Sequence, residues 1–138
     1  MKETYTLAYL GILIALTTLV TQSLIAATTK ASQKGAVPGK IDKDLSHSSF
    51  VFRAHRTFMN SLENFPAFLG AALLAVMTGA NVIWVNALVL TFAAARIVHM
   101  TLYYAIATEK NPSPRSYFYL IGMASTIGLL VLCAMALI

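Results

Sequence analysis

Long runs without a charged residue are the feature that most restricts what this chain can fold into. They cover residues 5–28, 64–95 and 116–138. A helix needs about 20 apolar residues to cross the hydrocarbon core of a bilayer, and each run is long enough. The 138 residues are 58% hydrophobic and 11% charged, which is more apolar surface than a soluble domain of this size can bury. The sequence therefore predicts an integral membrane protein.

Two polar segments and one short turn divide these runs into four predicted helices. Residues 30–49 are rich in Lys, Asp and Ser and contain Gly35 and Gly39, which favour a loop. Residues 108–114 form a second polar loop, and residues 79–81 predict a tight turn between antiparallel helices. We expect an all-α, integral membrane four-helix bundle, one domain over residues 1–138, with helices at about 5–28, 50–78, 82–107 and 115–138.

The distribution of basic residues predicts the orientation of the bundle. Four crossings place the two polar loops on one side of the membrane and the termini with the short turn on the other. Lys2 is the basic residue on the side of the termini, whereas the loop side carries Lys30, Lys34, Lys40, Lys43, Arg53, Arg56, Lys110 and Arg115. By the positive-inside rule the loop side is cytoplasmic. The short loops favour a bacterial inner membrane, with the endoplasmic reticulum as the alternative.

Each of the last three predicted helices carries several polar residues near the loops, and on the second and third helices their spacing places them on one helix face. Charges at membrane depth cost about 2.5–3.5 kcal/mol each, so such residues are expected to pair or to face a polar cavity. We expect the three faces to meet in one pocket. The residues are Arg56, Asn60 and Glu63 on the second helix, where Arg53 shares their face, then Arg96, His99 and Tyr103 on the third, and Arg115, Ser116 and Tyr119 on the fourth.

Such a pocket offers several cations, an amide, phenols and one carboxylate, which suits a small zwitterionic ligand with more acid than amine groups. No metal is expected, because the histidines have no carboxylate or cysteine partner at ligand spacing. The single cysteine, Cys133, excludes an intrachain disulfide. The net charge of +5 is spread between apolar runs and forms no nucleic-acid-binding patch.

Spacing alone also allows structural roles for the same residues. Arg53 is expected to extend towards the interface, as long basic side chains do near helix ends. An ion pair between Arg56 and Glu63 would lock helices together. A histidine on an apolar face, such as His99, is commonly hydrogen-bonded in a core rather than bound to a ligand.

The motif Arg-x-x-x-Asn-x-x-Glu at residues 56–63, followed by Phe-Pro at 65–66, resembles the signature of the MAPEG family, the membrane-associated proteins of eicosanoid and glutathione metabolism. Two further motifs are similar to the prostaglandin E synthase and glutathione transferase branches of that family. They are Arg-x-x-His-x-x-x-Tyr at 96–103 and Arg-Ser-x-x-Tyr at 115–119. The resemblance covers essentially the whole chain in length and hydropathy.

The resemblance implies a homotrimer of four-helix subunits that binds glutathione at each subunit interface, near the cytoplasmic face. It implies a glutathione-dependent transferase or peroxidase that uses glutathione as a co-substrate or cofactor. The implied second substrates are lipophilic electrophiles or hydroperoxides from the bilayer. The alternative is a non-catalytic lipid-binding or scaffold member. The implied catalytic residues are Arg115 and Ser116, and the implied glutathione contacts are Arg56, Asn60, Glu63, His99, Tyr103, Arg115 and Tyr119.

The chain departs from the family pattern at three places. The loop before Arg115 is longer than in the prostaglandin E synthase branch, which leaves Lys110 as an alternative thiol-activating cation. Lys30 and Lys34 are only loose matches to a basic residue that contacts glutathione from the first helix in many members. The histidine at position 99 stands where the leukotriene C branch has a tyrosine, which disfavours that activity.

Overall fold

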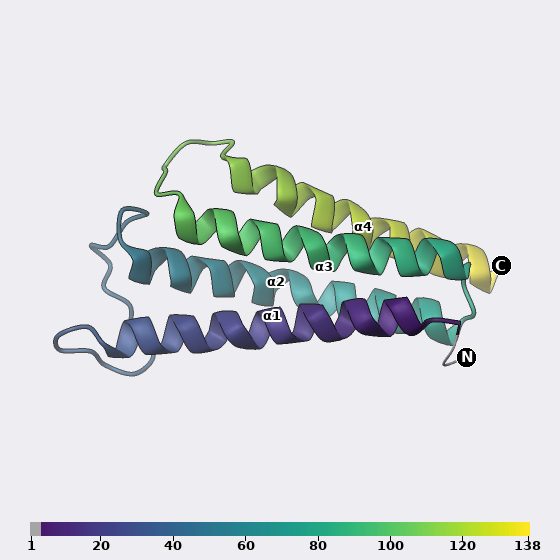
Figure 1. Ribbon diagram of the computed structural model, residues 1–138, viewed down its shortest axis with the longest axis horizontal. Coiled ribbons are helices and arrows are strands. Elements are labelled where there is room, and N and C mark those ends of the chain that lie inside the picture. The colour runs from purple at the N-terminus through teal and green to yellow at the C-terminus, as the bar shows by residue number, and fades with distance from the viewer. Residues whose placement is uncertain (1–3) are drawn as a thin grey trace.

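The computed structural model describes residues 4–138 and shows four helices, with no strand among the described residues (Figure 1). Lys2 lies outside the described residues. Helices α1, α3 and α4 are long and apolar enough to cross a membrane. The prediction of an all-helical membrane bundle is confirmed. The helices are α1, Thr6–Ala31; α2, Phe50–Met77; α3, Val82–Ala105; and α4, Pro114–Leu137.

Two helix ends differ from the expected bounds. Helix α1 continues past residue 28 to Ala31, with Lys30 in its last turn, where a cation interacts favourably with the negative end of the helix dipole. Helix α3 ends at Ala105 rather than at 107, because Ile106 adopts an extended backbone conformation. This earlier end lengthens the second polar loop.

The four helices run along one long axis, with both polar loops at one end and the termini at the other (Figure 1). Helices α2 and α3 each pack against α1 and against α4. The turn between α2 and α3 contains Gly79 with a φ of 68°, a backbone conformation that glycine adopts without steric cost. The side chain of Asn81 then caps α3 by accepting a hydrogen bond from the backbone N–H of Trp84.

Small residues allow the helices to approach closely. A Cβ atom added to Gly11 of α1 would lie 2.7 Å from Val89 Cγ1 of α3, so only glycine fits at this crossing. Phe68 of α2 stacks on Phe92 of α3 with ring centroids 3.6 Å apart. Large apolar side chains such as Leu13 point outwards and are exposed, as expected for a surface that faces lipid.

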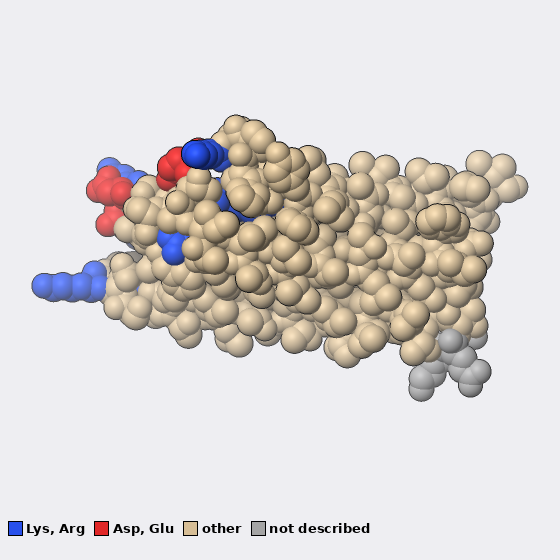
Figure 2. Space-filling model, turned by 45° about the horizontal axis from the view of Figure 1, so that its top comes forward, with Lys and Arg blue, Asp and Glu red and all other residues tan. Residues whose placement is uncertain are grey.

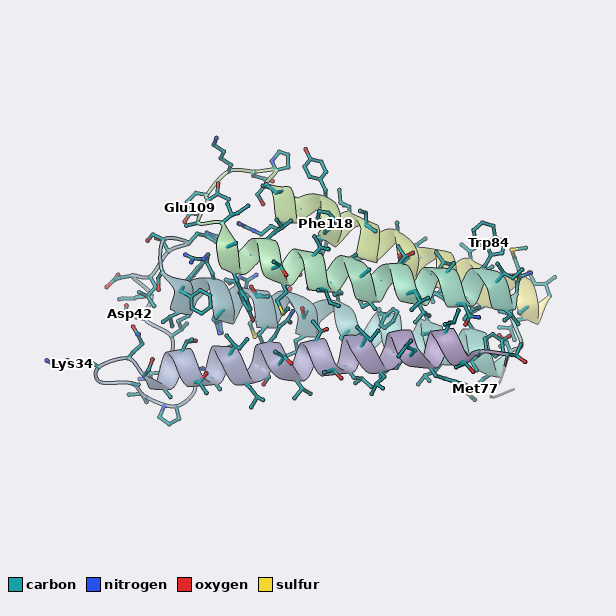
Figure 3. The ribbon with its side chains drawn as sticks, viewed as in Figure 1. Lys34, Asp42, Met77, Trp84, Glu109 and Phe118 are labelled. Atoms are coloured by element: carbon teal, nitrogen blue, oxygen red, sulfur yellow. The ribbon has the colours of Figure 1, made fainter. Side chains whose placement is uncertain are left out.

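Charged residues gather at the loop end of the molecule, while the visible face of the remainder is uncharged (Figure 2). Lys34, Asp42 and Glu109 lie at this end, whereas Met77 and Trp84 lie at the opposite end (Figure 3). The polar residues of α2 occupy its loop-end half, which explains why α2 is less apolar than the other three helices. The bundle therefore has one polar end and one apolar end.

We predict that the two ends of the bundle face opposite sides of the membrane, with the loop end cytoplasmic. A membrane-impermeant thiol reagent should label Gln33→Cys and Asn81→Cys from opposite sides, in a Cys133→Ala background. Both positions are exposed, whereas the adjacent Ala80 is only 2% exposed and is unsuitable. Labelling of both positions from the same side would contradict four crossings.

Candidate functional site

A cavity of about 230 Å³ lies at the loop end, where the beginning of α4 meets α2 and α3. Six of the residues selected from the sequence line this one cavity, although they come from three helices. No acidic residue of the described part of the chain lines it. The lining residues are Asn60 from α2, His99 and Tyr103 from α3, and Arg115, Ser116 and Tyr119 from α4.

Arg115 supplies the positive charge of the cavity. Its guanidinium donates a hydrogen bond to the Thr108 carbonyl oxygen at 3.3 Å and lies 4.1 Å from the ring centroid of Tyr103, a cation–π distance. No carboxylate forms an ion pair with it among residues 4–138. Its position in the first turn of α4 adds the positive end of a helix dipole. Lys110, the alternative cation, does not line the cavity.

His99 presents a buried nitrogen with no partner in the described part of the chain. The residue is almost fully buried, and its Nδ1 atom makes no hydrogen bond within the protein. Its ring contacts Tyr103 edge to face, with centroids 5.5 Å apart. Buried polar atoms are nearly always satisfied, but Nδ1 is closed off from the cavity, so a ligand there can reach this nitrogen only if the His99 ring turns.

Asn60 connects the cavity to a buried arginine behind it. Arg96 Nη2 donates to Asn60 Oδ1 at 2.8 Å and to Ser61 Oγ at 2.7 Å. Arg96 is thus paired with α2 and does not line the cavity, contrary to the expectation that it would join the pocket. Because the oxygen of the Asn60 amide is already occupied, its N–H₂ group is the part that can serve a ligand.

Ser116 has a structural role that its motif did not indicate. Its Oγ accepts a hydrogen bond from the Ser113 backbone N–H at 3.1 Å, which forms part of a capping box at the beginning of α4. Pro114 occupies the first turn of the helix, where its missing N–H costs nothing. The hydroxyl lines the cavity, but one of its acceptor sites is used by the cap.

Three polar residues of α2 do not join the cavity. Arg53 donates to the carbonyl oxygens of His47 at 2.7 Å and Ser48 at 3.1 Å, in the first loop, and of Tyr104 at 3.3 Å, near the end of α3. The side chain therefore binds backbone at the loop end instead of only extending to the interface. Glu63 is exposed, Arg56 is half-buried, and neither lines the cavity. No ion pair joins these two residues in the described part of the subunit.

The first loop covers two separate cavities of about 260 and 380 Å³. Lys30 borders both, and Lys34 borders the smaller one beside Lys40. Neither lysine reaches the cavity between α2, α3 and α4. Within residues 4–138 there is also no group of three or more His, Cys, Asp or Glu side chains able to hold a metal ion.

Sequence reasoning missed two loop residues beside the site: His47, which contacts Tyr103, and Glu109, which contacts His47. His47 Nε2 lies 3.0 Å from the Tyr103 hydroxyl, and His47 Nδ1 lies 2.8 Å from Glu109 Oε2. Both residues lie in loops, where helical periodicity gives no information about which side chains meet. The one available signal was that Glu109 is the only acidic residue of the second loop.

A membrane-embedded helical bundle with a cationic polar cavity at its loop end is the class of protein that this fold and site define. The family model of the MAPEG family matches residues 6–135, nearly the whole chain, and the protein belongs to this family. Members of the family are glutathione-related transferases, peroxidases or isomerases. Comparison with curated proteins and with solved structures gave no significant match.

Proposed function

We propose that the protein is a glutathione-dependent transferase or peroxidase that acts on lipophilic electrophiles or hydroperoxides dissolved in the bilayer. The observation that carries the proposal is the guanidinium of Arg115, which lines a polar cavity without a carboxylate partner. A partly buried cation of this kind favours an anionic ligand. The loop end is proposed to face the cytoplasm of a bacterium.

The groups that line the cavity fit glutathione. At neutral pH this tripeptide carries two carboxylates and one ammonium group, and so has a net negative charge. The cavity offers the Arg115 guanidinium, the N–H₂ group of Asn60 and the hydroxyl of Tyr119, with no opposing carboxylate.

A homotrimer would complete the site. Arg56 and Glu63 lie outside the cavity of their own subunit and have no ion-pair partner among the described residues. Contacts from a second copy of the chain would bring such residues to a ligand held between subunits. In this arrangement Glu63 provides the carboxylate that the ammonium group of glutathione requires.

The chemistry needs no nucleophile from the protein. A free thiol has a pKa of about 8.5 and is mostly protonated at neutral pH, and a fixed cation beside it favours the thiolate. Arg115 and the N-terminus of α4 would act together in this way. In conjugation the thiolate sulfur forms a bond to an electrophilic carbon of the second substrate, while the bond from that carbon to its leaving group breaks and the leaving group departs with the electron pair. Cys133, the single cysteine, is buried far from the loop end and is not required.

The test is the ultraviolet difference spectrum of the purified protein with glutathione. A thiolate band at neutral pH would support an enzyme that activates the thiol. Binding of glutathione without this band would favour the alternative, a non-catalytic lipid-binding or scaffold member of the family.

We predict that Arg56→Ala and Glu63→Ala each weaken glutathione binding by at least about tenfold, which corresponds to about 1.4 kcal/mol. Isothermal titration of the trimer in detergent, combined with a double-mutant cycle, is the measurement. If the two residues only pair with each other across subunits, the cycle will show coupling in stability, and the affinity of correctly assembled protein will not change. That result would remove both residues from the ligand site.

A further inference from the structure

His47 joins the two polar loops through a single carboxylate. Its backbone N–H donates to Glu109 Oε1 at 3.0 Å, and its Nδ1 lies 2.8 Å from Glu109 Oε2. Both oxygens of Glu109 are therefore bound to one residue that is distant in the sequence. The edge of the His47 ring also packs against Phe52, with centroids 4.9 Å apart. The imidazole is held in a defined orientation at the loop end, where Figure 3 shows Glu109.

The other ring nitrogen of His47 reaches the cavity wall. Nε2 lies 3.0 Å from the hydroxyl of Tyr103, which lines the cavity. The three side chains form a continuous row from solvent to the site, because the exposed fraction is 66% for the Glu109 side chain, 19% for that of His47, and 7% for the residue Tyr103. A change in the charge of His47 therefore acts directly on a group that faces the ligand.

The hydrogen bonds determine which atom holds each proton. The bonds from His47 hold the pKa of the Glu109 carboxyl below its usual range, so at neutral pH it is ionised and can only accept. His47 Nδ1 must then carry a proton, which leaves Nε2 of the neutral ring as an acceptor. The hydroxyl of Tyr103 donates to that acceptor, and its proton points away from the cavity.

We propose that His47 and Glu109 are positioning residues that control the hydrogen-bonding direction of Tyr103 in the cavity. While His47 is neutral, Tyr103 offers the ligand only an acceptor. When His47 takes up a second proton, Nε2 becomes a donor to the phenol oxygen, and the Tyr103 proton is free to turn towards the ligand. The identity of that ligand, the glutathione anion, rests on the proposed function.

The surroundings of His47 include charges of both signs. Glu109 contacts the ring itself, and the guanidinium of Arg53 is bound to the His47 carbonyl oxygen. Arg115 and His99 both contact the Tyr103 ring, and the charge of Arg115 also acts on Glu109. Protonation of His47 adds a positive charge next to Tyr103 and frees a donor, and both effects favour an anion. Binding of the ligand should therefore be tighter when His47 carries a second proton, which lower pH favours.

The first experiment examines the unliganded protein. The chain has three histidines, so selective ¹⁵N-histidine labelling in detergent micelles gives three imidazole signals, and His47→Gln identifies that of His47. We expect the Nδ1–H form at neutral pH. In Glu109→Gln the carboxylate that requires this form is gone, and the Nε2–H form should become populated. An Nε2–H form in the unsubstituted protein would overturn the proposal.

The second experiment measures the affinity of S-methylglutathione, which has no ionisable thiol, between about pH 5 and 7.5, a window in which its carboxyl and ammonium groups do not titrate appreciably. Affinity should rise about three- to tenfold towards the lower pH, as expected for one added hydrogen bond. His47→Asn keeps an N–H close to the position of Nδ1, and so can retain the bond to Glu109, but it does not reach Tyr103 and cannot titrate. It should abolish the pH dependence without lowering the unfolding temperature.

Two controls separate this role from a loop latch. Asp44→Asn removes a charge from the first loop, and His55→Gln removes another histidine near the beginning of α2, and both should keep the pH dependence. If His47 only holds the loops together, His47→Asn will behave like the unsubstituted protein, and the positioning role is refuted. If no variant binds glutathione, the proposed function fails, while the ¹⁵N experiment still decides the state of Tyr103.

Discussion

Replacing Arg115 by alanine should lower glutathione-dependent turnover by about 10²–10³-fold, the range found when one fixed electrostatic group is removed from an active site. The physical reason is the position of the guanidinium, which lines the cavity in the first turn of α4 and forms no ion pair with a described carboxylate, although Glu109, outside the cavity, feels its charge. Binding should weaken less than turnover, because the peptide part of glutathione is assigned to Asn60 and to Arg56 and Glu63 of the assembled trimer.

The measurements are the thiolate absorption of bound glutathione and the pH–rate profile. In Arg115→Ala the thiolate band should disappear at neutral pH, and the profile should move to higher pH as the thiol pKa returns towards its ordinary value. Arg115→Lys should restore part of the activity, because a lysine keeps the charge but not the planar fork. Lys110→Ala is the matched control and should be unaffected. Unchanged turnover in Arg115→Ala would exclude Arg115 as the residue that activates the thiol.

Ser116→Ala should produce a different pattern from Arg115→Ala. Since Ser116 Oγ caps the Ser113 N–H, its loss should destabilise the beginning of α4 by about 1 kcal/mol. A fall in the unfolding temperature with a small change in turnover would identify a mainly structural residue. A large loss of turnover with unchanged stability would restore the catalytic role suggested by the Arg-Ser motif.

The course of the chain could be predicted because membrane-spanning helices are restricted by simple physics. Backbone polar groups must be satisfied within each apolar segment, so runs such as residues 5–28 and 116–138 permit little except helices. The end of α3 at Ala105 was not predictable, since residues 106–107 are apolar and neutral. The state of assembly stays a prediction.

Helical periodicity predicted which residues of α2, α3 and α4 meet, because residues three and four positions apart share a face. His99 and Tyr103 do line one cavity with Arg115 and Tyr119. Periodicity failed where a long side chain turns to a neighbour on another helix, as Arg96 turns to Asn60 and Ser61 of α2. It also gave no information about loop residues, such as His47, which contacts Tyr103.

Replacing Asn60 should affect both stability and ligand binding, because this residue lines the cavity and also accepts a hydrogen bond from the buried Arg96. Arg96 is 4% exposed in the middle of a predicted membrane span and has two acceptors on α2, Asn60 Oδ1 and Ser61 Oγ. Asn60→Leu removes one of the two acceptors from a buried charge. We expect a destabilisation of about 1.5–3 kcal/mol, the range for hydrogen bonds to charged groups.

Asn60→Asp separates the two roles. The carboxylate keeps an acceptor for Arg96, so unfolding in detergent should be close to that of the unsubstituted protein. It also places a negative charge in a cavity that otherwise has no acidic residue, so an anionic ligand should bind at least about tenfold more weakly, or about 1.4 kcal/mol. Thermal unfolding and glutathione titration of both variants are the measurements. If Asn60→Asp is stable and binds glutathione normally, the ligand does not place its negative charge near α2, and the cavity must hold it by Arg115 alone.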